Sequence, residues 1–147
     1  MASMRLQAHA LLASVLTSVI ASAAAQPFAP RLYAVATETG LPHLEENLRY
    51  ATTRSRLCLG RPQLATAFPI LQHEALKGCT LDHERSSGAS LSLHLTCEGG
   101  SQTTGAAEWH VDELGIHGTL DVKLGGKNMT FYQRINGRPV GDCAPGD

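Results

Sequence analysis

The 147-residue chain lacks a bias toward charge of either sign. Its 12 Lys and Arg residues balance 13 Asp and Glu residues, which leaves a formal net charge of −1. No strong electrostatic field therefore attracts nucleic acid or an anionic membrane surface, and we expect neither as a partner. After residue 25 the chain also lacks any apolar stretch long enough to span a membrane. The sequence thus predicts a soluble mature protein with no membrane span.

The chain also lacks the common motifs of enzymes and metal proteins. It has no Cys-x-x-Cys pair, so neither a thioredoxin-type motif nor a zinc knuckle is indicated. It has no Gly-x-Ser-x-Gly elbow and no glycine-rich phosphate loop. His73-Glu74 begins like a His-Glu-x-x-His zinc helix, but Lys77 stands where the second histidine would be. Because no nucleophile and base have an interpretable spacing, an uncharacterised hydrolase is the weakest functional hypothesis.

What the chain has at its start is the pattern of an export signal. Arg5 supplies a short positive region, and an apolar stretch of modest length follows it. This stretch is shorter than the roughly 20 apolar residues of a bilayer span. Ala23 and Ala25 suit the −3 and −1 positions of a signal peptidase site. We expect cleavage after Ala25, with Ala23 as the second choice, which leaves residues 26–147 as one domain in the periplasm.

From Gly78 onward, apolar and polar residues alternate between clusters of Gly and Ser. This period of two is typical of strands with one buried and one solvent-exposed face. Tight turns between them predict a mainly β fold, an antiparallel up-and-down meander that forms a curved sheet or a partly closed barrel. The expected strands are Cys79–Glu84, Ser90–Cys97, Gly105–Val111, Ile116–Leu124 and Lys127–Ile135. The expected inward residues are Leu91, Leu93, Leu95, Cys97, Ala107, Trp109, Val111, Leu120, Val122, Leu124, Met129, Phe131 and Ile135.

The part of the chain before Gly78 is less regular. Leu32–Thr37 has the composition of a strand, while Leu41–Tyr50 has helical spacing of its leucines and is ambiguous. Gly60–Lys77 is predicted to be a short helical excursion. Because proline breaks a helix, we expect one short helix before Pro69, over Gln63–Phe68, and a further turn after it.

Four cysteines allow three disulfide pairings. Pairing the first two meander strands about Gly88 places Cys79 opposite Cys97, at a distance that a disulfide can bridge. We therefore favour Cys79–Cys97 with Cys58–Cys143, and the alternative of Cys58–Cys79 with Cys97–Cys143 remains open. In a small exported domain such bridges are structural rather than redox-active. Each is expected to stabilise the fold by roughly 3–5 kcal/mol.

Short motifs around the cysteines carry a resemblance to a known family. They are Cys58-Leu59-Gly60, Phe68-Pro69-Ile70-Leu71, Gly78-Cys79, Leu95-Thr96-Cys97-Glu98-Gly99, Gly125-Gly126-Lys127-Asn128-Met129-Thr130-Phe131 and Gly141-Asp142-Cys143. With these motifs the chain resembles the domain of unknown function 3617 family, small exported envelope proteins of Gram-negative bacteria. Members commonly have a Gly-x-Trp in the first strand, where this chain has Tyr33. The resemblance implies a compartment and a fold, and it implies no activity or ligand.

Three histidines are predicted on the polar face of the sheet. His94 and His110 alternate with apolar residues, and so does His117 on the next strand. Pairing around the 112–115 turn sets His110 opposite His117, and we expect His94 to lie opposite Glu108. Imidazoles on neighbouring strands can bind zinc or copper, so a metal site at these three residues is one hypothesis. The alternative is three ordinary surface histidines.

The favoured hypothesis is a non-catalytic binding or accessory protein of the cell envelope. A curved sheet with an apolar concave face can hold an apolar ligand or dock an envelope protein. The helical excursion decides the matter, because Phe68, Ile70 and Leu71 are expected to cover that face. An incomplete cover would leave a cavity lined by Leu93, Trp109, Leu120 and Phe131. A complete cover would move function to the polar face or the loops.

Overall fold

The computed structural model describes residues 26–42, 50–99, 102–126 and 129–146. The expected signal peptide, residues 1–25, and most of the ambiguous segment, residues 43–49, lie outside the described residues. No helix among the described residues is long and apolar enough to cross a membrane.

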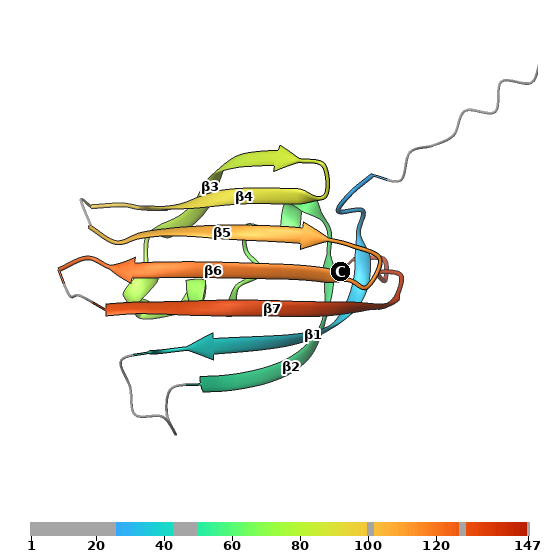
Figure 1. Ribbon diagram of the computed structural model, residues 1–147, viewed down its shortest axis with the longest axis horizontal. Helices are drawn as coiled ribbons and strands as arrows, with labels where there is room; N and C mark the ends of the chain where they lie inside the picture. The colour runs from blue at the N-terminus through green and yellow to red at the C-terminus, as the bar shows by residue number, and fades with distance from the viewer. Residues whose placement is uncertain (1–25, 43–49, 100–101, 127–128, 147) are drawn as a thin grey trace, which may run out of the picture.

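Seven antiparallel strands form one sheet that does not close into a barrel (Figure 1). The strands are β1 (Arg31–Gly40), β2 (Tyr50–Leu59), β3 (Cys79–Ser87), β4 (Ser90–Cys97), β5 (Thr104–Val111), β6 (Ile116–Leu124) and β7 (Met129–Gly141). Their order across the sheet is β2-β1-β7-β6-β5-β4-β3. Strands β3 to β7 are the predicted meander. The β1–β2 hairpin joins it at β7, so β2 and β3 are the two edges.

The predicted faces of the meander strands are confirmed. Alternate residues of β4 to β7 are buried, and the residues between them are mostly exposed. The last strand was expected at Lys127–Ile135, and β7 continues beyond that end to Gly141. Residues 127–128 lie outside the described residues. The added length extends the pairing with β1, because Tyr33 to Ala36 pair with residues 136–139.

The chain passes from one edge of the sheet to the other through residues 60–77, which we call the crossover. In Figure 1 it runs behind the sheet, from the end of β2 to the start of β3. It contains three 3-10 turns, η1 (Arg61–Gln63), η2 (Pro69–Gln72) and η3 (Glu74–Leu76), so the predicted helix over Gln63–Phe68 is wrong. Each of η1 and η2 has a proline in its first two positions. The segment between the two prolines is too short to sustain an α-helix.

The crossover covers the centre of the apolar face of the sheet. Phe68 is 0% exposed, and its ring packs on Trp109 with the ring centroids 4.9 Å apart. Leu64 and Leu76 are as deeply buried, while Ile70 and Leu71 are partly buried against the core. The expected cover is therefore confirmed and is supplemented by two leucines. The four residues that would line a cavity, Leu93, Trp109, Leu120 and Phe131, are between 0% and 6% exposed.

A buried glutamine fixes the crossover to the sheet. Gln133 points inward from β7 and is 4% exposed. Its side-chain oxygen accepts a hydrogen bond from the Ile70 N–H at 3.1 Å, and its amide nitrogen donates to Thr39 Oγ1 at 2.8 Å. Both polar ends of the amide are thus satisfied, which is the condition for burying it without a large cost.

One disulfide lies at each end of the crossover. Cys58, just before it, is bonded to Cys143, with the Cα atoms 5.4 Å apart. Cys79, just after it, is bonded to Cys97, its register partner on β4. This is the favoured pairing of the four cysteines. The crossover is therefore held covalently on both sides as well as by packing.

Candidate functional site

The polar face of the sheet, opposite the crossover, presents a row of side chains that crosses all seven strands. Each member is the direct register partner of the next. From β2 to β3 the row is Arg54, Ala36, Asn136, His117, His110, Ser90 and Ser87. Directly opposite side chains on neighbouring strands have Cβ atoms about 5 Å apart, so successive members of the row are within reach of one another.

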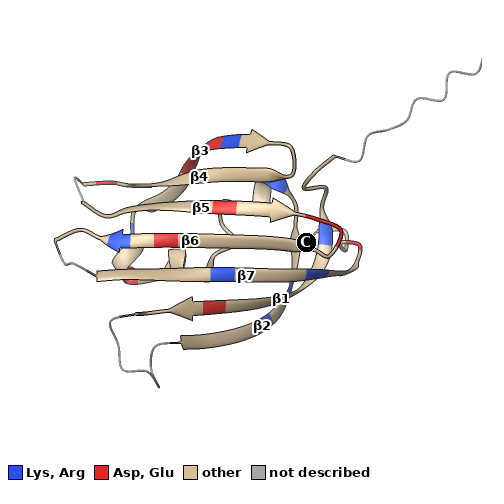
Figure 2. Ribbon diagram, in the orientation of Figure 1, with Lys and Arg blue, Asp and Glu red and all other residues tan. Residues whose placement is uncertain are grey.

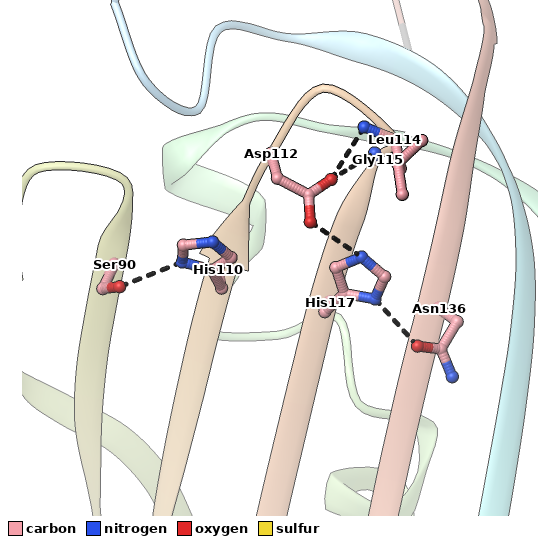
Figure 3. Close-up of polar contacts among 7 residues, drawn as sticks. All are labelled: Ser90, His110, Asp112, Leu114, Gly115, His117 and Asn136. Atoms are coloured by element: carbon pink, nitrogen blue, oxygen red, sulfur yellow. Dashed lines mark hydrogen bonds and ion pairs between the residues drawn. The ribbon is translucent and has the colours of Figure 1, made fainter.

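The centre of this row is the predicted histidine pair. His110 and His117 are register partners across β5 and β6, as expected. Each imidazole contacts the next member of the row through Nδ1 (Figure 3). His110 contacts Ser90 Oγ at 3.1 Å, and His117 contacts Asn136 Oδ1 at 2.9 Å. The two rings are thus oriented by neighbours on β4 and β7.

The turn between the two histidine strands is ordered by Asp112. Its Oδ1 accepts hydrogen bonds from the N–H groups of Leu114 at 2.7 Å and Gly115 at 2.9 Å. Its Oδ2 lies 3.5 Å from His117 Nε2. The pKa of the Asp112 carboxyl is lowered, chiefly by the hydrogen bond from Gly115, then by that from Leu114, and further by His117 and His110. A carboxylate therefore both shapes the turn and faces the histidine pair.

His94 does not join this pair, and its expected partner is wrong. The structure pairs His94 with Ala106 on β5 and Asp82 on β3, while Glu108 pairs with Ser92. The error is a register slip of two residues. Such a slip keeps every side chain on its face, so the alternation of apolar residues cannot reveal it.

The predicted three-histidine metal site is accordingly not assembled. Within the described residues, no group of three or more His, Cys, Asp and Glu side chains is placed to hold a metal ion. The hydrolase hypothesis also finds no support. Ser90 contacts His110, whereas the Asp112 carboxylate contacts His117. The serine and the carboxylate thus contact different imidazoles, while a Ser-His-Asp relay needs one imidazole between them.

Three hollows lie side by side on the polar face. The first, with a volume of about 390 Å³, is bordered by β3 to β6 and contains His110 and His117 in its lining. The second, about 360 Å³, shares His117 with the first and adds Ala34 and Arg138. The third, about 460 Å³, shares those last two residues with the second and extends to Arg56 on β2. Shared lining residues therefore join the hollows into one surface, which we call the polar groove.

The two ends of the polar groove differ in chemistry. The first hollow is rich in hydroxyls and carries one carboxylate and one guanidinium, with Ser86, Ser87, Ser90, Ser92, Thr119, Glu108 and Arg85 in its lining. The third hollow carries Arg54, Arg56 and Arg138 around two alanines. In Figure 2, β5 carries red, while blue lies on β2 and at the end of β7.

The sequence interpretation missed most residues of the groove. Asp112 and Ser90 were assigned only to a turn and a strand, and Asn136 lies beyond the expected end of the last strand. The arginines of β2 could not be placed, since nothing local relates that strand to β7. One signal for Asp112 was available. An Asp at the start of a turn commonly accepts hydrogen bonds from the backbone N–H groups two and three residues later.

Comparison with known proteins adds a family and no activity. A family model described as "Protein of unknown function (DUF3617)" matches residues 13–143, which is most of the chain and agrees with the resemblance found in the sequence. The chain matches no curated protein and no solved structure.

Proposed function

The chain belongs to the DUF3617 family, and we propose that it is an exported, non-catalytic binding protein of the cell envelope whose ligand lies in the polar groove. The observation that carries this proposal is the continuity of the three hollows across the strands. The row that they follow spans six inter-strand spacings of about 4.8 Å each, so an extended ligand could contact every strand.

The covered centre of the apolar face favours a polar ligand over an apolar one. Phe68, Leu64 and Leu76 fill the space above the centre of the sheet. The polar face instead offers hydroxyls, imidazoles and guanidinium groups that converge on shared hollows. A few such groups at defined positions in a concave site are what fixes the orientation of a small molecule.

Export to the periplasm is part of the same proposal. Two disulfides and no free cysteine among the described residues suit an oxidising compartment, since cytosolic reductants keep thiols reduced. The opening of the chain, with Arg5, an apolar stretch and small residues up to Ala25, supports this placement.

Native mass spectrometry of protein purified from its own envelope tests the proposal. We expect a small molecule to accompany the wild-type chain. Ser92→Phe introduces a ring into the lining of the first hollow and should displace that molecule. Ala106→Phe is the matched control, because it adds the same ring to an exposed position of the same face outside the groove. It should leave the complex intact.

Two results would contradict this function. A wild-type protein that carries no small molecule under native conditions would remove its basis. Equal loss of the bound molecule in Ser92→Phe and Ala106→Phe would place binding elsewhere on the protein.

A further inference from the structure

We infer that the third hollow of the polar groove binds a phosphate-ester group through Arg54, Arg56 and Arg138. This inference rests on the proposed function for the rest of the ligand, and it names the chemical group recognised at one end. The hollow lies on the polar face of β2, β1 and β7, far along the row from the histidine pair.

The register of the three strands creates the hollow. Ala34 on β1 is the direct partner of both Arg56 on β2 and Arg138 on β7. Two strand spacings separate the arginine backbones, about 10 Å, and the alanine between them fills little of that width. Ala36 repeats the arrangement one step along, with Arg54 on its β2 side. Long arginine side chains thus border a floor made of methyl groups.

The three guanidinium groups have no carboxylate partner within the described part of the chain. The ion pairs of arginine there are Arg61 with Glu84 and Arg134 with Glu38. No acidic residue lines the third hollow. Three like charges around one hollow repel one another, and an anion bound between them would relieve that repulsion.

Phosphate is the anion that this geometry suits best. A guanidinium presents its donors in a planar fork, and each fork can hold two oxygens of one phosphate. A tetrahedral dianion offers oxygens toward β2 and β7 at once, whereas a planar carboxylate offers two oxygens in one plane. The hollow is continuous with the second one through Ala34 and Arg138. An ester substituent can therefore leave the site along the polar groove.

Titration of the wild-type protein with glycerol 1-phosphate tests the inference. The signals of the arginine Nε–H groups in a nitrogen-15 NMR spectrum report each guanidinium directly. We expect saturating shifts for Arg54, Arg56 and Arg138. Acetate should bind at least about 10-fold more weakly, because it cannot engage both sides of the hollow. Equal affinity for acetate would overturn the assignment to phosphate.

Two variants separate a built site from diffuse positive charge. Arg138→Gln removes one fork, and Ala34→Leu fills the floor without a change in charge. Each should weaken glycerol 1-phosphate binding by about 10-fold or more. Arg134→Gln is the matched control, since Arg134 lies on the same face of β7 but is paired with Glu38 and stacked on Tyr132. Equal weakening by Arg134→Gln, or unchanged binding in Ala34→Leu, would overturn the inference.

Vesicles distinguish the two sources of a phosphate ester. Binding of glycerol 1-phosphate without binding to phosphatidylcholine vesicles that contain one-fifth phosphatidic acid, the lipid that carries a phosphomonoester, would indicate a soluble ligand. Arg138-dependent and Ala34-dependent binding to those vesicles would indicate a lipid headgroup. No binding of either probe would overturn the inference. Failure here leaves the proposed function standing if the Ser92→Phe variant still loses the molecule that co-purifies with the wild type.

Discussion

Trp109 lies against Gly118, its direct cross-strand partner on β6. A Cβ atom at Gly118 would come within 2.5 Å of the indole ring. The absence of a side chain at this position therefore gives the largest core residue its space beneath Phe68. The apolar pattern of β6 does not reveal this role, since glycine contributes nothing to it.

Gly118→Ala should destabilise the fold by about 1–3 kcal/mol, because the added methyl group forces the indole out of its position. Gly141→Ala is the control, since a Cβ there meets no atom within 4 Å, and it should change stability by less than about 0.5 kcal/mol. Urea unfolding followed by tryptophan fluorescence measures both. Similar losses of stability in the two variants would show that contact with Trp109 is not the reason why position 118 requires glycine.

Gln133→Leu should loosen the crossover by leaving the Ile70 N–H and the Thr39 hydroxyl without their partner. Each buried polar group left unpaired costs about 1–3 kcal/mol. Gln72→Leu, at an exposed position of η2, is the control and should be near neutral. Hydrogen exchange provides the specific measurement, because the Ile70 amide should exchange faster in Gln133→Leu alone. Unchanged protection of that amide would show that the Gln133 side chain does not hold the crossover to the sheet.

Removal of the two disulfides should have unequal costs. Cys58–Cys143 closes a sequence separation of 85 residues and Cys79–Cys97 one of 18. Loop-closure entropy predicts losses of about 4.5 and about 3 kcal/mol for the respective double serine variants. Denaturant unfolding of each variant measures the difference, after non-reducing peptide mapping has verified the bridges in the wild type. A greater cost for the shorter loop would contradict the entropic explanation.

The acid sensitivity of the fold should depend on Asp112. Its pKa is lowered in the folded state by the Gly115 and Leu114 N–H groups. Such a carboxylate stabilises the fold above the unfolded pKa of about 3.9, and this contribution is lost as pH falls through the lower folded pKa. Asp112→Asn should therefore be less stable than the wild type near neutral pH and converge with it in strong acid. The control is Asp121→Asn, at an exposed position on the polar face of β6.

Unfolding free energies at a series of pH values provide the measurement for Asp112. A stability difference between wild type and Asp112→Asn that is constant from pH 2 to pH 7 would contradict the assignment. An equal pH dependence in Asp121→Asn would show that general surface charge, rather than the ordered turn, is responsible.

The period of two revealed the faces of the meander, but it could not reveal every register. His110 and His117 were paired correctly because a short turn at Asp112 leaves little freedom between their strands. His94 was displaced by two residues because the connection from β4 to β5 is longer, and a slip of two preserves burial. The half of the candidate site next to a tight turn was thus predictable, and the half set by a longer loop was not.

Long-range pairing explains the other omissions. The third hollow needs β1 beside β7, and the partners Ala34 and Arg138 lie at opposite ends of the chain. The pattern in each strand is local and carries no information about such a neighbour. The backbone conformation of the crossover was also not predicted, for a different reason. Phe68 was recognised as a cover, but the backbone form was set by Pro62 and Pro69, which open 3-10 turns where a helix was expected.

The nested order of the disulfides has a consequence for how the protein matures. A chain exported with its N-terminus first, as proposed, presents Cys58 to the oxidising machinery long before its partner Cys143 arrives. The first thiol to follow it is Cys79, so oxidation in order of emergence would join the wrong pair. Native protein therefore requires either a delay at Cys58 or a thiol–disulfide isomerase that reshuffles the early product. The β1–β2 hairpin can join the sheet only late, because its neighbour β7 emerges last among the strands.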